Sequence, residues 1–83
     1  HWLIMAAAPK SEALGILGGR LRERRHELRL SQEALAVRAD LHWSYIGQVE
    51  RGQRDFGVQN LLKLAKALQI EPGELVNGLS LPD

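Results

Sequence analysis

The chain has 83 residues, with 11 Lys and Arg against 10 Asp and Glu, and it contains no cysteine. This length suffices for one domain, and the lack of cysteine excludes disulfides, thiolate metal sites and cysteine nucleophiles, as expected in a reducing cytoplasm. The formal net charge of +1 does not by itself indicate a polyanionic partner.

Basic residues are unevenly distributed along the chain. Between Leu17 and Asp55 eight arginines stand against six acidic residues, whereas no Lys or Arg follows Lys66. One part of the molecule can therefore face phosphate while the other faces a neutral or apolar partner. Arginine-rich helices are also common as plain solvated faces, so charge alone leaves both interpretations open.

Residues 1–11 are predicted to form a flexible tail, because they show neither a helical nor a strand period. Met5 is a candidate natural start, and residues 1–4 would then be an upstream remnant. The apolar run here is too short for a membrane span and lacks the basic leader of a signal peptide, so no membrane association is expected.

The first two helices are predicted from apolar spacing and caps. The first runs from Ser11 or Glu12 to Leu28, and its glycine-containing start is weak because each glycine costs about 1 kcal/mol relative to alanine. The second, Gln32–Ala39, follows Ser31, a favourable N-cap residue. Its inward side chains are predicted to be Leu35, Ala36 and Ala39.

Three more helices follow. After a tight turn at Asp40 and Leu41, a third helix spans about His42–Arg51, and Gly52 follows in the left-handed position that often ends a helix. A polar loop at residues 53–57 leads to the fourth helix, and Pro72 opens a short fifth one that reaches Val76. The buried stripe of the fourth helix, Val58–Leu68, is predicted to be Val58, Leu61, Leu62, Ala65 and Leu68.

The predicted fold class is all-α: a compact, repressor-like five-helix domain over residues 12–78, followed by a C-terminal tail at residues 79–83. No segment has the alternating, β-branched character of a strand. The second and third helices and their short turn meet the requirements of a helix-turn-helix unit. Ala36 is small enough for the helix crossing, and Asp40 tolerates the positive φ that the turn requires.

The outward positions near the start of the third helix are candidate DNA base contacts. They are His42, Trp43, Ser44 and Gln48. Gln48 can pair with adenine, Ser44 can donate or accept, and Trp43 can press on a thymine methyl group. An alternative is that Trp43 only packs against its own chain. Gln32, at the start of the second helix, is predicted to meet a phosphate of the DNA backbone.

Four segments of the chain resemble the Xre-like helix-turn-helix family, which includes lambdoid phage repressors, Cro proteins and restriction–modification controller proteins. They are Leu30-Ser31-Gln32-Glu33-Ala34-Leu35-Ala36, Tyr45-Ile46, Glu50-Arg51-Gly52 and Leu61-Leu62-Lys63-Leu64-Ala65-Lys66-Ala67-Leu68. The resemblance covers about Leu17 to Leu75, and the stretch from Ser44 to Gly52 is most similar to the controller proteins.

The resemblance implies a domain that dimerises through its C-terminal region and binds a palindromic operator. It also implies that Arg25 pairs with Glu50 and so sets the angle of the recognition helix. Tyr45 and Arg54 would lie close to the DNA backbone, and Arg51 is predicted to join them there.

The chain departs from the family pattern at three positions. Arg29 stands where glycine is common, which predicts a looser turn after the first helix. Asp40 replaces the usual glycine and adds a negative charge near the DNA. Trp43 occupies a position that is usually polar or basic, so the family's base preference does not carry over to it.

Apolar residues near the C-terminus exceed what a small monomer needs to bury and are predicted to form a dimer interface. They are Ile70, Leu75, Val76 and Leu79, with Leu81 beyond them. The alternative is that Ile70 and Leu75 complete the core of the monomer while the last leucines stay free.

The predicted function is therefore a sequence-specific transcriptional regulator that binds double-stranded DNA as a homodimer in the cytoplasm of a bacterium, encoded by the bacterium or a phage. No enzyme activity, cofactor or small-molecule effector is expected, because no catalytic or phosphate-binding motif is present. His26 and His42 are too far apart for a helical metal pair, so no metal site is predicted. Two alternatives are an antitoxin-type module whose C-terminal region covers a partner protein, and a recruiting module that binds protein instead of DNA.

Overall fold

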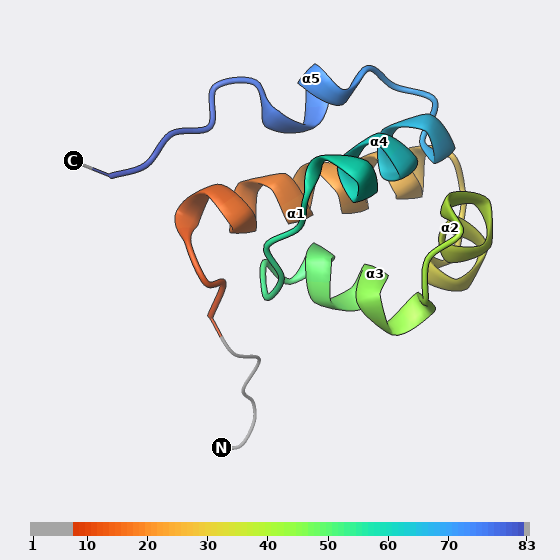
Figure 1. Ribbon diagram of the computed structural model, residues 1–83. Coiled ribbons are helices and arrows are strands. Elements are labelled where there is room, and N and C mark those ends of the chain that lie inside the picture. Colours follow the sequence, from red (N-terminus) through yellow and green to blue (C-terminus); the bar gives the residue numbers. More distant parts are fainter. Residues whose placement is uncertain (1–7, 83) are drawn as a thin grey trace.

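The computed structural model describes residues 8–82, which fold into five helices and contain no strand (Figure 1). In chain order these are α1 (Glu12–Glu27), α2 (Gln32–Ala39), α3 (Trp43–Glu50), α4 (Val58–Ala67) and α5 (Pro72–Val76). The predicted all-α class and the five helices are confirmed.

Serine side chains start the first two helices. The Ser11 hydroxyl accepts the Leu14 N–H at 3.1 Å, and the Ser31 hydroxyl accepts the Ala34 N–H at 3.0 Å. Each bond satisfies one of the amide groups that a helix start leaves without an internal partner. The predicted starts of α1 and α2 are therefore confirmed.

Four helices end in the same way, with one residue in the left-handed conformation. These residues are Arg29, Asp40, Gly52 and Gln69, with φ angles of 58°, 56°, 71° and 59°. After α1, Arg29 N–H donates to the His26 carbonyl at 2.9 Å and Leu30 N–H to the Arg25 carbonyl at 3.1 Å. This is the Schellman pattern, so the expectation of a looser turn at Arg29 is wrong.

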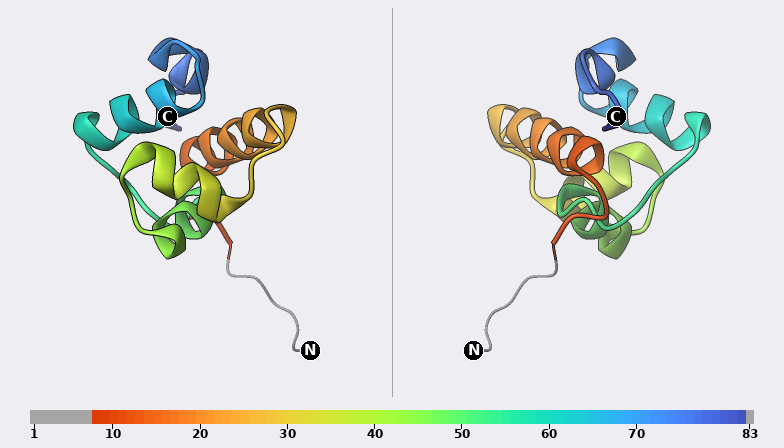
Figure 2. Two further views of the ribbon diagram at one scale, coloured as in Figure 1. Left: turned by 90° about the vertical axis from the view of Figure 1, so that its right-hand side faces the viewer. Right: turned by 90° about the vertical axis from the view of Figure 1, so that its left-hand side faces the viewer.

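The core is built from all five helices. Its largest fully buried side chains are Leu21, Leu35, Ile46, Val49, Leu64, Leu68 and Leu75. Helix α1 contacts both α3 and α5 and lies between them in Figure 1, whereas Figure 2 shows it at one side of the molecule, opposite α4. Helices α3 and α5 are thereby both held by α1.

The predicted buried stripe of α4 is wrong at two positions. Val58 and Leu62 are 69% and 47% exposed, whereas Leu64 and Ala67 are buried. Both sets of residues repeat every three or four positions, so periodicity alone cannot decide which edge of an apolar stripe meets the core. Packing of α4 against α2 and α5 buries the edge that contains Leu64.

The two chain ends also differ from the prediction. Leu75 is fully buried in the core, so its assignment to a dimer interface is wrong, and Leu79 packs on the core instead of lying in a free tail. Lys10 N–H donates to the Gly52 carbonyl at 2.8 Å, so the end of the predicted flexible tail is held in place. The rest of that tail, residues 1–7, lies outside the described residues.

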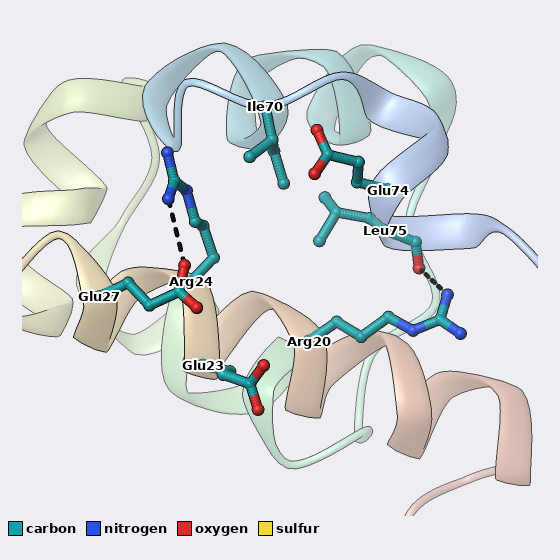
Figure 3. A pocket seen from close by; sticks show the side chains of 7 residues that line it. All are labelled: Arg20, Glu23, Arg24, Glu27, Ile70, Glu74 and Leu75. Atoms are coloured by element: carbon teal, nitrogen blue, oxygen red, sulfur yellow. Dashed lines mark hydrogen bonds and ion pairs between the residues drawn. The ribbon is translucent and has the colours of Figure 1, made fainter.

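Two arginines of α1 bind the ends of the last two helices. Arg20 Nη1 donates to the carbonyls of Leu75, at 3.1 Å, and Asn77, at 2.6 Å, while Arg24 Nε donates to the Leu68 carbonyl at 2.9 Å. Cations are favoured at helix C-termini, where carbonyl groups lack internal partners. Figure 3 shows Arg20 crossing the shallow groove between α1 and α5 to reach the Leu75 carbonyl. These arginines thus have a structural role, since they join α1 to the ends of α4 and α5.

Helix α1 crosses the end of α3 at Gly18 with the two backbones in direct contact. A Cβ atom on Gly18 would lie 2.3 Å from the Val49 carbonyl oxygen and 2.6 Å from that of Glu50. Neighbouring Gly19 faces away, and a Cβ atom there would have no neighbour within 4 Å. Glycine at position 18 therefore lowers the helix propensity of α1 but allows α1 and α3 to approach each other closely.

We expect Gly18→Ala and Gly19→Ala to have opposite effects on stability. Gly18→Ala should lower the free energy of unfolding by about 2–3 kcal/mol or more, because backbone atoms must move apart to admit the methyl group. Gly19→Ala should raise it by about 0.5–1 kcal/mol through helix propensity. Urea unfolding followed by circular dichroism measures both, and similar midpoints for the two variants would contradict the close contact.

Candidate nucleic-acid interface

A buried ion pair joins α1 to the end of α3. Arg25 Nε lies 2.6 Å from Glu50 Oε2 and Arg25 Nη2 lies 2.9 Å from Glu50 Oε1, and the two side chains are 9% and 3% exposed. Arg25 Nη1 donates to the Leu30 carbonyl at 2.8 Å, and Gln32 Nε2 donates to Glu50 Oε1 at 3.1 Å. The structure contains the Arg25–Glu50 pair that the family resemblance implies. Through Gln32, the hydrogen bonds of this pair also reach the start of α2.

This environment keeps the Arg25 guanidinium charged. The hydrogen bond to Glu50 raises the pKa of Arg25 and outweighs the lowering by burial, and the charges of Glu50 and Glu33 raise it further. A raised pKa stabilises the fold at every pH below the ordinary arginine pKa, and this stabilisation is lost only as the pH rises through the raised value. The contribution of Arg25 is therefore constant around neutral pH.

The inner face of α3 is buried, and part of its outer face is exposed. Ile46 and Val49 are fully buried, whereas Trp43 is 55% exposed and Ser44 is also exposed. Gln48, one turn after Ser44, is half-buried, and its side chain has no hydrogen-bond partner within residues 8–82. These positions therefore form an outward patch on a helix that is held from behind by the core and by Glu50.

The start of α3 contains a local network that the sequence did not predict. His42 is the N-cap residue, and its Nδ1 accepts the Ser44 N–H at 3.2 Å and lies 2.8 Å from Ser44 Oγ. The Trp43 ring stacks near the His42 ring, with centroids 6.0 Å apart and planes inclined by 27°. The sequence signal that could have predicted this role is a histidine at the N-cap position, because its ring nitrogen can accept a hydrogen bond from a backbone N–H. The side chains of His42 and Ser44 are thus already in contact with each other in the protein without a ligand.

Tyr45 is the centre of a second cluster, at the loop between α3 and α4. Its hydroxyl accepts a hydrogen bond from Asn60 Nδ2 at 3.0 Å, and its ring meets the edge of Phe56 at 6.4 Å. The guanidinium carbon of Arg54 lies 5.0 Å from the Tyr45 ring centroid, a cation–π arrangement. Asn60 was not among the predicted site residues. The Tyr45 O–H can still donate, because in its bond to Asn60 the hydroxyl is the acceptor.

Two of the predicted backbone contacts have different surroundings. Gln32 is half-buried and its amide already supports Glu50, so it has a structural role beside any contact with phosphate. Arg51, at the C-cap of α3, is exposed. Arg51, beside Gly47, and Arg54, over the Tyr45 ring, therefore present two exposed cations close to α3.

Two kinds of feature are missing from residues 8–82. No group of three or more His, Asp or Glu side chains in this range is arranged to hold a metal ion. Within the same range, no helix has the length and apolar character required to cross a membrane.

Comparisons with known proteins agree on one family. Its model, described as helix-turn-helix, matches residues 21–75. The control protein C.BamHI of Bacillus amyloliquefaciens is 44% identical over 48 residues, which are 58% of this chain and 59% of that protein. This chain therefore covers less than two thirds of the length of that curated relative.

Two solved structures are similar over most of the chain. The restriction-modification controller protein C.AhdI from Aeromonas hydrophila has 56% sequence identity and a TM-score of 0.73, covering 75% of this chain and 94% of its own. The c2 repressor of phage P22, solved in complex with a synthetic operator, has 38% identity and a TM-score of 0.72, covering 77% and 97%.

We expect Arg25→Ala to remove a large part of the stability of the fold. The substitution leaves the Glu50 carboxylate buried without its partner, which costs about 3–5 kcal/mol. Domains of this kind have a total stability of only about 5–15 kcal/mol. Thermal melting followed by circular dichroism measures the loss, and Arg22→Ala, at an exposed position of the same helix, is the control. Equal melting temperatures for the two variants would contradict a structural role for the pair.

Proposed function

This chain belongs to the helix-turn-helix family, and from that membership we propose that it recognises a specific sequence in double-stranded DNA and regulates transcription. Helix α3 is the recognition helix, which enters the major groove in proteins of this kind. The observation that carries the proposal is the outward patch of Trp43, Ser44 and Gln48 on a helix that the buried Arg25–Glu50 pair holds in position.

The proposed contacts divide into two classes. Base edges are contacted from the start and the outer face of α3, by His42, Trp43, Ser44 and Gln48. The sugar–phosphate backbone is contacted by Gln32, Tyr45, Arg51 and Arg54. Contacts to phosphate set affinity and register, whereas contacts to base edges set sequence preference. Two observations support the contact of Tyr45 with phosphate: its hydroxyl proton is available to donate, and Arg54 lies over its ring.

We propose that the protein acts as a homodimer on a palindromic operator whose half-sites are about 34 Å apart, one helical turn. The dimer surface consists of the apolar side chains near α5 that the core leaves partly or wholly exposed: Ile70, Val76, Leu79 and Leu81. This surface is separated from α3 by α1 (Figure 1), so a second copy can bind there while α3 remains free for DNA.

The relatives suggest a biological role. C.BamHI is a control protein, C.AhdI is a restriction-modification controller and c2 is a phage repressor. By analogy, this chain would control a nearby promoter in the bacterial cytoplasm, where the DNA lies. The same α5 surface would instead cover a different protein if the chain were an antitoxin-type module.

We expect Gln48→Ala to weaken binding to the preferred site and to leave folding unchanged. Loss of a bidentate contact to a base costs about 1–3 kcal/mol of discrimination, which is roughly 5- to 150-fold. The site is first obtained by selection from random duplexes, and affinities for it and for unrelated DNA are then measured at one salt concentration.

The control for this measurement is Gln59→Ala, the same substitution at an exposed position of α4. It should leave the ratio of specific to non-specific affinity as in the wild type. A Gln48→Ala variant that keeps the wild-type ratio would remove Gln48 from the base contacts. Absence of any preferred duplex for the wild type would refute the proposed function.

We expect Val76→Lys and Leu81→Lys to produce monomers at concentrations where the wild type sediments as a dimer, since each places a charge in an apolar interface. Leu81 is 82% exposed, so its substitution cannot act through the core. Val37→Lys, at a valine of α2 that is 83% exposed, is the control and should leave the dimer intact. A monomeric wild type, free and on DNA, would contradict the dimer, and co-purification with a second protein would favour the antitoxin-type alternative.

A further inference from the structure

The imidazole ring of His42 is held at a fixed place in front of α3. Its Nδ1 receives the Ser44 N–H at 3.2 Å and lies 2.8 Å from Ser44 Oγ. The Trp43 ring, at 6.0 Å and 27°, restricts the remaining rotation of the imidazole. The orientation of the ring in the structure is therefore supported by the residue that it caps and by the residue that stacks on it.

The same contacts determine which ring nitrogen carries the proton. A backbone N–H can only donate, so Nδ1 must offer its lone pair to Ser44. A neutral imidazole has a single N–H group, which must then be on Nε2. Since Nδ1 has no proton to give, the Ser44 hydroxyl is the donor in the 2.8 Å contact as well.

The two side chains consequently have different free groups. His42 and Ser44 are both exposed, and Nε2–H of His42 has no acceptor among residues 8–82. The Ser44 hydroxyl has directed its proton to His42 and has only oxygen lone pairs left. Although either residue could donate or accept a hydrogen bond in another setting, here His42 can only donate one to a ligand and Ser44 can only accept one.

We propose that His42 determines sequence preference as a donor of fixed position, giving its Nε2–H to N7 or O6 on the major-groove edge of a purine. Ser44 acts beside it only as an acceptor, for the amino group of cytosine or adenine. Both assignments follow the pattern of donors and acceptors that base pairs present in the major groove. This inference rests on the proposed function, because it names the chemistry of two of the proposed base contacts.

Two isosteric substitutions separate the capping nitrogen from the donor. In His42→Asn the side-chain oxygen replaces Nδ1, and asparagine is a favourable N-cap, but nothing replaces Nε2–H. In His42→Gln the amide nitrogen replaces Nε2–H, but nothing replaces Nδ1. Each variant therefore keeps one function of the ring and removes the other.

For His42→Asn we expect a wild-type melting temperature and an affinity for the selected site that is weaker by on the order of tenfold, with no change for unrelated DNA. For His42→Gln we expect a melting temperature lower by about 4–8 °C, from the lost cap, with much of the preference for the selected site retained. Wild-type affinity in His42→Asn would overturn the proposal. An equal loss on selected and unrelated DNA would also overturn it, because His42 would then contact phosphate.

The contacted atom can be identified in the selected site. Replacing each purine in turn by its 7-deaza analogue removes one N7 acceptor, and replacing guanine by 2-aminopurine removes O6. One such replacement should weaken wild-type binding by on the order of tenfold and leave His42→Asn binding unchanged. If every purine replacement weakened the binding of His42→Asn as much as that of the wild type, the assignment of His42 to a base would be overturned.

The protonation site can be measured without DNA. Proton–nitrogen correlation spectra of the free protein at about pH 8, where histidines are neutral, should show a proton on Nε2 of His42 and a bare Nδ1. His42→Asn identifies the resonances by their loss. A proton on Nδ1 would overturn this inference while leaving the proposed function standing, whereas a wild type with no preferred duplex would refute the proposed function whatever the spectra show.

Discussion

The buried contact between Arg25 and Glu50 is the constraint on which the rest of the structure depends. A guanidinium and a carboxylate taken out of water are stable only together, so the chain must bring the last turn of α1 to the last residue of α3. Gly18 makes the same crossing of α1 and α3 possible, because only a residue without Cβ lets the α1 backbone contact the α3 carbonyls. Together they leave α3 very little freedom of angle. A helix of eight residues, too short to be stable alone, is thereby made rigid enough to present side chains to a ligand.

The arginines of the chain show how one residue type serves two purposes. Arg20, Arg24 and Arg25 lie on the side of α1 that meets other helices, and all three bind carbonyl or carboxylate oxygens of the protein itself. Arg51, at the C-cap of α3, and Arg54, over the Tyr45 ring, are exposed instead. The number of positive charges in the chain is therefore larger than the number that is available to a ligand. This explains why the net charge says little about the ligand.

Sequence reasoning predicted the helices well and the packing less well. Helix starts and ends depend on neighbouring residues, as at Ser11, Ser31 and Gly52, and these were predicted correctly. The exposed side of α4 and the burial of Leu75 depend on which helices lie next to them in space, and there the prediction was wrong. The network of His42, Trp43 and Ser44 and the partnership of Tyr45 with Asn60 were missed. Each depends on a side-chain direction that residue spacing does not specify.

The amino-acid sequence by itself therefore determined the all-α class, the helix boundaries and the helix-turn-helix unit, because apolar spacing, caps and left-handed turns act within a few residues. Only the tertiary structure decided which arginines bind other parts of the protein, which apolar residues near α5 stay exposed, and which partners the side chains of His42 and Ser44 have. These properties arise from contacts between segments distant in the chain and from the orientation of single side chains. Their free energy depends on burial and geometry, which a linear pattern of residue types does not contain.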